Sequence, residues 1–234
     1  MQKVIVIFGA GQGLSFSVAQ YYGQRGYQVA LVSRHQAKLQ KLADQLQSQN
    51  IKSAIFTADL TSAEQTQQVI IDIQKTLGSI HALYYAPNPQ DGFSPAHTLT
   101  PEDLAPKVEL YFYGLIRVVQ NILPIFRENK GGLILSAVGG SAVNGFAFMS
   151  GLGPVMAASR NYLQSLQQEL ISEHIQVGLI TISAQIENSA SFVASQQHKA
   201  TDETSPFPTV HPDELAELLA HAAQDDARLE ACYP

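Results

Sequence analysis

The 234-residue chain is poor in several chemically informative residue types, with one cysteine, three methionines and no tryptophan. Its lone Cys232 excludes a disulfide framework and any cysteine-based metal site. No apolar run approaches the roughly 18 residues that a membrane-spanning helix requires. The N-terminal run Val4–Phe8 is too short for a signal peptide. We therefore expect a soluble, cytoplasmic protein that forms a single domain over residues 1–234.

Several motifs of catalysis and binding are also missing. The seven histidines include no H-E-x-x-H pair, so we expect no metal site. Neither the G-x-S-x-G turn of serine hydrolases nor the Gly-Lys-Ser/Thr loop of P-loop ATPases occurs. With a formal net charge of −6, the chain offers no basic surface for nucleic acid or an anionic membrane.

Short apolar runs alternate with longer amphipathic stretches along the chain. This alternation is typical of βαβ units and a parallel sheet, and the unbroken apolar character of the runs indicates helices on both sheet faces. The expected strands are Val4–Phe8, Gln28–Val32, Ala54–Ala58, Ala82–Ala86, Leu133–Val138 and Val177–Ser183, with Leu229–Tyr233 as a seventh at the edge. The expected helices span 14–25, 36–49, 62–77, 102–128, 154–173 and 212–223.

Residues at the expected helix starts support these boundaries. Thr61-x-x-Glu64 has the spacing of a capping box. Thr100-Pro101-Glu102-Asp103 combines an N-cap, a first-turn proline and two acids that the helix dipole favours. His211-Pro212-Asp213-Glu214 repeats that pattern near the end of the chain.

A glycine-rich turn, Gly9-Ala10-Gly11-Gln12-Gly13-Leu14-Ser15, joins the first expected strand to a helix. A dinucleotide pyrophosphate binds in this context, against closely approaching backbone and a helix N-terminus. The spacing departs from G-x-G-x-x-G because Leu14 stands at the third glycine. It half-fits G-x-x-x-G-x-G, with Gly9 and Gly13 present and Ser15 in the last place. A glycine-rich turn without a ligand is the alternative interpretation.

The second expected strand ends in Val32-Ser33-Arg34-His35, where a dinucleotide fold meets the adenosine ribose. An acidic residue there would bind the ribose 2′-hydroxyl, whereas arginine suits a 2′-phosphate. No aspartate or glutamate occurs between Gln28 and Ala43. If a cofactor binds, we therefore expect NADP(H) in preference to NAD(H), and a solvated surface arginine is the alternative.

Motifs along nearly the whole chain together resemble those of the short-chain dehydrogenase/reductase family. The family's G-x-x-x-G-x-G is matched by Gly9 and Gly13. Its Asp-Leu after the third strand is matched by Asp59-Leu60. Further matches are Gly114 with Leu123-Pro124 in the long fifth helix, and Ser165-Leu166-Gln167-Gln168-Glu169-Leu170 in the sixth. The resemblance implies a doubly wound Rossmann-like fold with a seven-stranded, mostly parallel sheet in the order 3-2-1-4-5-6-7.

The resemblance also implies where a cofactor would contact the chain. The pyrophosphate would lie over Gly9–Leu14, and the adenosine would lie between Arg34 and Asp59-Leu60. The family's Asn-Asn-Ala-Gly corresponds to Tyr85-Ala86-Pro87-Asn88, which keeps the place but not the residues. Ile186 would supply the backbone contact to the carboxamide. The expected cofactor-binding residues are Gly9, Gln12, Gly13, Leu14, Ser33, Arg34, Asp59, Leu60, Ala86, Pro87 and Ile186.

The catalytic residues of the family are missing. Family members use a serine and a Tyr-x-x-x-Lys pair, in which the ammonium makes the tyrosine a usable acid and base near neutral pH. Leu152 stands at the tyrosine position, Met156 at the lysine position, and Gly139 near the serine position. No tyrosine occurs between Gly114 and Asn161, and no lysine between Gly131 and His198. No shift of the alignment therefore restores the pair.

Other hydroxyl groups are candidates to replace the missing acid. Tyr85, Tyr111 and Tyr113 belong to segments that approach the nicotinamide in this family, and Ser136, Ser141 and Ser150 lie on or after the fifth expected strand. The alternative roles are packing for the tyrosines and loop hydroxyls for the serines. The catalytic residues are therefore unknown, with Tyr85, Tyr111 and Ser136 as the named candidates.

Three functions remain open. The chain is an atypical NADP(H)-dependent oxidoreductase acting on a small carbonyl or unsaturated substrate, a catalytically inactive NADP(H)-binding sensor, or an association subunit that binds no nucleotide. We expect a mobile substrate lid over residues 185–208. Glu109–Val119 is apolar nearly all round, which indicates core or subunit packing, and the resemblance implies a homodimer or homotetramer.

Overall fold

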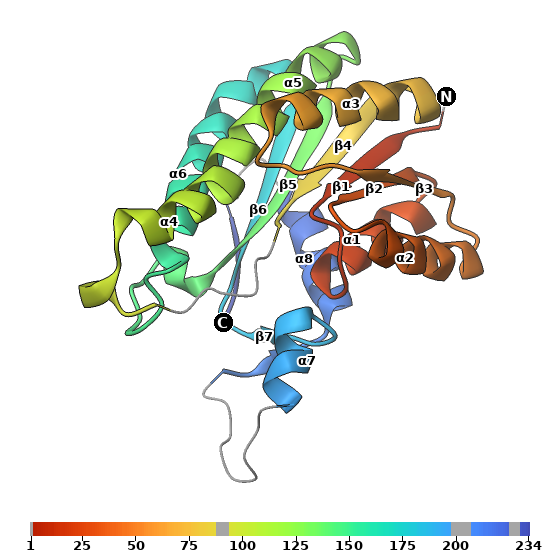
Figure 1. Ribbon diagram of the computed structural model, residues 1–234. Coiled ribbons are helices and arrows are strands. Elements are labelled where there is room, and N and C mark those ends of the chain that lie inside the picture. Colours follow the sequence, from red (N-terminus) through yellow and green to blue (C-terminus); the bar gives the residue numbers. More distant parts are fainter. Residues whose placement is uncertain (1, 88–93, 198–206, 225–229) are drawn as a thin grey trace.

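A seven-stranded parallel sheet forms the middle layer of the molecule, with helices on both faces (Figure 1). The computed structural model describes residues 2–87, 94–197, 207–224 and 230–234. The strands run in the order β3-β2-β1-β4-β5-β6-β9, which confirms the predicted fold class and strand order. Their bounds are β1 Val4–Phe8, β2 Gln28–Ser33, β3 Ser53–Thr57, β4 Ile80–Tyr85, β5 Gly132–Gly139, β6 Ile175–Ile182 and β9 Ala231–Tyr233.

Two hydrophobic cores explain why the central strands are apolar throughout. Alternate side chains of a strand point to opposite faces, so Val4, Val6 and Phe8 enter one core while Ile5 and Ile7 enter the other. All five are fully buried. The first core is covered by α3 Ala63–Leu77, α5 Gly114–Glu128 and α6 Gly153–Leu170, and the second by α1 Leu14–Gln24, α2 Gln36–Ser48 and α8 Pro212–Ala222.

Two of the three predicted helix starts match the structure, and the third is shifted by one residue. Thr100 forms the predicted capping box with Asp103, and His211 caps α8. The prediction of Thr61 as the cap of α3 was wrong. Thr61 donates from both its amide and its hydroxyl to Asp59, at 3.0 and 2.8 Å, so Ser62 caps the helix instead.

The helix predicted over 102–128 contains a π-helical segment that was not predicted. It consists of α4 Pro101–Val108, the π segment η2 Glu109–Tyr113 and α5. The Gly114 amide donates to the Glu109 carbonyl, five residues back. Side-chain hydroxyls bind the two following carbonyls: Tyr85 donates to that of Leu110, and Ser159 to that of Tyr111, the latter at 3.1 Å. Outside donors thus replace bonds that an α-helix would make internally.

The C-terminal edge strand β9 is fixed by a nearly buried carboxylate. The Glu230 side chain is 7% exposed and lies 2.6 Å from the Arg160 guanidinium. Gln164 and Thr181 also donate to it. A buried carboxylate is tolerated only with such partners, so this cluster couples β9 to α6 and β6.

The segment over the carboxyl edge of the sheet contains short elements that were not predicted. Strand β7 Gln185–Ile186 pairs in parallel with β8 Thr209–Val210, and α7 Ala190–Gln197 lies between them in sequence. Of the predicted lid, residues 198–206 fall outside the described residues. The remaining short helices are η1 Ala96–Thr98, η3 Gly140–Ala142 and η4 Ile171–Glu173. Within the part of the chain that the structure describes, no helix is long and apolar enough to cross a membrane.

Candidate functional site

The glycine-rich turn lies between β1 and α1, and its conformation requires glycine. Gly9 and Gly13 have φ values of 83° and 84°, a region that side chains rarely adopt. A Cβ atom on Gly9 would lie 2.6 Å from the Cα of Pro87. The amides of Gly9 and Ala10 both donate to the Val32 carbonyl at 2.9 Å. The turn is therefore fixed between β2 and the residues after β4.

Ser15 stands in place of the last glycine of the family motif and hydrogen-bonds the backbone of the turn through its side chain. Its hydroxyl donates to the Gly11 carbonyl at 2.8 Å and accepts from the Gly11 amide at 3.0 Å. Gly13 is the N-cap of α1, whose first turn contains no acidic residue. The positive end of the helix dipole is therefore not neutralised there. Leu14 is buried, while Gln12 is exposed and donates to Gln45 of α2 at 2.9 Å.

The N-terminus of α7 packs on Gly13, a contact that no sequence signal indicated. A Cβ atom on Gly13 would lie 3.1 Å from the Cβ of Ser189. Ser189 is buried, and its hydroxyl accepts from the Phe192 amide at 3.1 Å as the cap of α7. The starts of α1 and α7 thus meet at this glycine.

Arg34 and Asp59 lie at the ends of neighbouring strands, where the adenosine was expected. Arg34 is exposed just after β2, and Ser33 before it is half-buried. The pKa of Asp59 lies below its usual value, chiefly because the Thr61 amide donates to the carboxylate, with smaller contributions from the Thr61 hydroxyl and the Arg34 charge. Arg34 and Asp59 thus follow neighbouring parallel strands at the same edge of the sheet.

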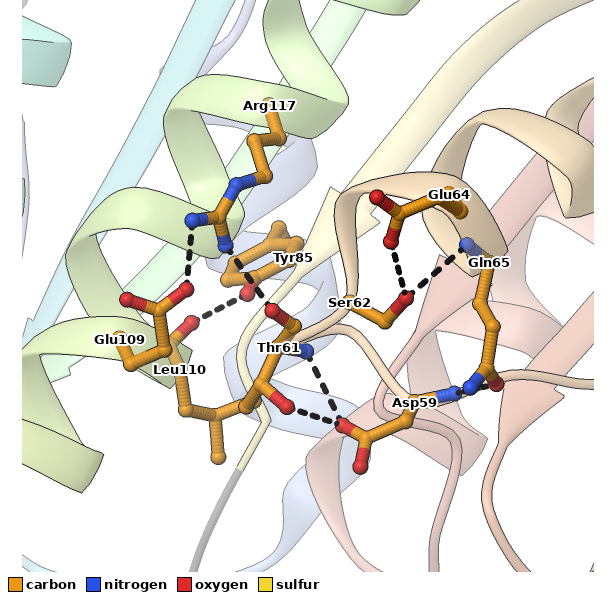
Figure 2. Close-up of polar contacts among 9 residues, drawn as sticks. All are labelled: Asp59, Thr61, Ser62, Glu64, Gln65, Tyr85, Glu109, Leu110 and Arg117. Atoms are coloured by element: carbon orange, nitrogen blue, oxygen red, sulfur yellow. Dashed lines mark hydrogen bonds and ion pairs between the residues drawn. The ribbon is translucent and has the colours of Figure 1, made fainter.

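Helix α5 and the π segment support the turn that carries Asp59 (Figure 2). Arg117 donates to the Thr61 carbonyl at 3.3 Å and forms a 2.5 Å ion pair with Glu109. Gly114 permits the approach, because a Cβ there would lie 3.0 Å from the Leu60 carbonyl oxygen. These contacts join the Asp-Leu turn to the interrupted helix.

The remaining cofactor-contact predictions fall on the carboxyl edges of β4 and β7. Pro87 is buried against Gly9, and Ala86 before it is half-buried. Asn88 lies outside the described residues. Ile186, also half-buried, accepts from the Ser189 hydroxyl through its carbonyl at 2.7 Å. The structure therefore brings Pro87 and, through Ser189, the backbone of Ile186 to the glycine-rich turn.

The three positions of the missing catalytic residues lie where β5 ends and α6 begins. Leu152 is the N-cap of α6 and is half-buried. The Met156 sulfur lies 3.4 Å from the Gly139 amide, which donates to it. A thioether neither carries a positive charge nor exchanges a proton at neutral pH. These three residues therefore supply no acid, base or ammonium.

The named substitute acids are buried, and two of them use their hydroxyls to bind backbone. Ser136 donates to the Tyr85 carbonyl at 2.6 Å, and Tyr85 donates to the Leu110 carbonyl. Burial raises the pKa of Tyr85 above its ordinary value. Tyr111 is buried in the π segment, and its carbonyl accepts from Ser159. The contacts of Tyr85 and Ser136 thus assign both a structural role at the π segment and β4.

Among the residues that the structure describes, no group of three or more histidine, cysteine, aspartate or glutamate side chains is arranged to hold a metal ion.

Comparisons of sequence and of structure both relate this chain to short chain dehydrogenases. Residues 3–189 match the profile of the short chain dehydrogenase family. An uncharacterized oxidoreductase of Listeria monocytogenes is 22% identical over 228 residues, covering 94% of this chain and 90% of that protein. A variant of actinorhodin polyketide ketoreductase solved with NADPH has a TM-score of 0.87 at 19% identity, covering 99% of this chain and 95% of that one.

A further similar fold is the apo short chain oxidoreductase from Pseudomonas aeruginosa PAO1, described as containing an atypical catalytic center. It has a TM-score of 0.87 at 17% identity, covering 98% of this chain and 94% of that one. At such identities the solved structures establish the fold alone.

Proposed function

The chain belongs to the short chain dehydrogenase family, and from that premise we propose that it is an atypical NADP(H)-dependent oxidoreductase. Its substrate would be a small carbonyl or unsaturated compound, reduced or oxidised without the family's tyrosine and lysine. The observation that carries this proposal is the glycine-rich turn after β1, with its positive φ angles at Gly9 and Gly13, together with Arg34 after β2 and Asp59 after β3, the next two strands of the sheet.

The residues of the turn fit a dinucleotide. Gly9 and Gly13 supply the positive φ angles of the turn, and a Cβ atom on Gly11 would meet no atom within 4 Å. The unneutralised N-terminus of α1 favours a pyrophosphate. Arg34 has the charge and planar donors for a 2′-phosphate, and Asp59-Leu60 would hold the adenine. Bound nicotinamide would exchange a hydride with a substrate carbon.

A catalytically inactive NADP(H)-binding protein is the second candidate. One feature favours it: Gly139, Leu152 and Met156 align with the family's serine, tyrosine and lysine, and none of them can act as an acid or base. General acid–base catalysis contributes roughly 10²–10⁴-fold to a rate. Hydride transfer without it would be slow, and faster where solvent or the substrate supplies the proton.

Both candidates require that the protein binds NADP(H), which calorimetric titration with NADPH and, separately, NADH tests. We expect micromolar binding of NADPH and much weaker binding of NADH. A following screen of carbonyl and enone compounds, read as NADPH oxidation, separates the oxidoreductase from the inactive binder. If neither nucleotide binds, both candidates fail and the chain is better described as an association subunit.

Residues 185–208 remain, in our proposal, a substrate lid whose described part is β7 and α7. A homodimer or homotetramer and a cytoplasmic location are proposed on the same family basis. Light scattering of the purified protein and cell fractionation test these two proposals.

A further inference from the structure

Ser141, one of the loop serines considered as a replacement donor, lies near two of the positions that align with the family's catalytic residues. Ser141 belongs to η3, the short 3-10 turn that follows β5, and is half-buried. Its hydroxyl oxygen is 3.7 Å from where a Cβ atom on Gly139 would be. The family's serine would begin at that Cβ, so Ser141 brings a hydroxyl to the neighbourhood of the missing one.

The start of α6 contacts the same serine from the other side. A Cβ atom on Gly153 would lie 2.9 Å from the Ser141 carbonyl oxygen and 3.4 Å from its Cβ. Gly153 directly follows Leu152, which occupies the tyrosine position. Ser141 thus contacts the first residue of α6 through its backbone and Cβ, while its hydroxyl lies near the end of β5.

Two glycines make this placement possible. A Cβ atom on Gly153 would crowd the Ser141 carbonyl oxygen, and one on Gly140 would collide with the Ser183 side chain. The η3 turn can therefore fold back on the end of β5. Met156, whose sulfur is also 3.7 Å from the Gly139 Cβ position, forms an apolar wall on this site.

We propose that Ser141 is a catalytic residue that donates a hydrogen bond to the carbonyl oxygen of the substrate, in place of the missing serine. This inference rests on the proposed oxidoreductase function. As a hydride adds to the carbonyl carbon, the π electron pair moves to the oxygen, which takes a proton from water, and NADPH is converted to NADP⁺. The Ser141 hydroxyl stabilises the negative charge that develops on the oxygen.

A single hydroxyl that faces a developing oxyanion can contribute a large factor to a rate. Leu152 and Met156 supply no competing donor. Removing one such donor from an oxyanion site lowers a rate by about 10²–10³-fold. We therefore expect Ser141→Ala to lower kcat by about 10²-fold and to raise KM by at most about tenfold, because the hydrogen bond is stronger in the transition state than in the bound ketone.

A measurement without turnover tests the hydrogen bond directly. Cyclohexanone carrying carbon-13 at its carbonyl is bound to the protein saturated with NADP⁺, which has no hydride to give, and the carbonyl stretch is recorded by infrared difference spectroscopy. We expect a band at lower wavenumber than in an apolar solvent. In Ser141→Ala this band should move to higher wavenumber, and the ketone should bind up to tenfold more weakly.

Two further variants make the result specific. Ser150→Ala removes a hydroxyl from the same loop and should leave the band where it is. The double variant Gly139→Ser/Ser141→Ala moves the hydroxyl to the family position, where ordinary van der Waals space exists, and should restore the low-wavenumber band.

Every outcome decides the proposal. An unchanged band in Ser141→Ala overturns it, as does the absence of a bound-ketone band when calorimetry shows NADP⁺ bound. In either case the NADP(H) site stands. Failure of NADP⁺ to bind instead refutes the proposed function, on which the role of Ser141 depends.

Discussion

The two ends of the candidate site differ in what they keep of the family's chemistry. At the proposed adenosine end, Arg34 and Asp59 are present, and Arg117 donates to the turn after β3. At the proposed catalytic end, Gly139, Leu152 and Met156 align with the family's serine, tyrosine and lysine. The first set follows β2 and β3, and the second lies on β5 and α6. Because separate elements supply them, the catalytic set can be replaced without disturbing the other.

The largest expected effect comes from putting the family's serine, tyrosine and lysine back into the chain, which tests whether the two sets of residues are independent. The triple variant Gly139→Ser/Leu152→Tyr/Met156→Lys should raise NADPH oxidation with a small ketone by about 10²–10⁴-fold, because an acid–base tyrosine and its ammonium partner return. NADPH affinity should change little. Gly139→Ser alone is the control and should not reproduce the gain. An unchanged rate with NADPH bound would mean that more than these side chains has been lost.

Disrupting the turn between the two ends should damage folding as well as binding. Gly9→Ala should lower the free energy of unfolding by about 3 kcal/mol, because the new Cβ collides with Pro87 at a φ that alanine rarely adopts. Urea denaturation measures the loss. Gly11→Ala is the matched control, with open space around its Cβ position, and should cost less than about 1 kcal/mol. Equal losses would contradict the steric argument.

The cofactor preference assigned to the adenosine end rests on one arginine. Arg34→Ala should weaken NADPH binding by roughly 10–100-fold while leaving NADH unchanged, because only NADPH carries the 2′-phosphate that the guanidinium would bind. Calorimetry with both nucleotides measures this. Lys38→Ala, an exposed cation on α2, should have little effect. Equal weakening of both nucleotides would remove the 2′-phosphate interpretation.

Asp59 should make a small contribution to stability that depends on pH. Its pKa is lowered in the folded protein, chiefly by the Thr61 amide. Its stabilisation is therefore present above about pH 4 and is lost as the pH falls through the lower, folded value. Asp59→Asn should lower the free energy of unfolding by about 1 kcal/mol at pH 7 and by less at pH 3. Asp44→Asn, at an exposed position on α2, should show no such pH dependence.

The strands and most helix bounds follow from local patterns in the sequence, and the strand order follows from the resemblance to the family. Apolar runs, the Thr100 cap and the glycine-rich turn each specify their structure within a few neighbouring residues, so the layered fold could be predicted. The π segment could not, because it depends on Tyr85 and Ser159, each distant in sequence from the carbonyl that it binds.

The candidate site was predictable to a smaller extent for the same reason. The end of the second expected strand pointed to Arg34, and family motifs pointed to Asp59 and to the positions of the missing catalytic residues. The contacts of Ser141 with Gly139 and Gly153, and of Ser189 with Gly13, come from how three loops pack together. The cap of α3 moved to Ser62 because Asp59 binds Thr61, a competition between neighbours that spacing alone does not resolve.

Ser189 contacts a side of Gly13 that a bound pyrophosphate would also contact. A pyrophosphate approaching Gly13 from that side competes with a segment of the same chain, which is present at a high effective concentration. The affinity measured for a nucleotide is then the intrinsic affinity multiplied by the fraction of molecules in which α7 has moved away. Conditions or variants that stabilise the packing of α7 on Gly13 would therefore weaken the apparent binding of a nucleotide, as a competitive inhibitor does.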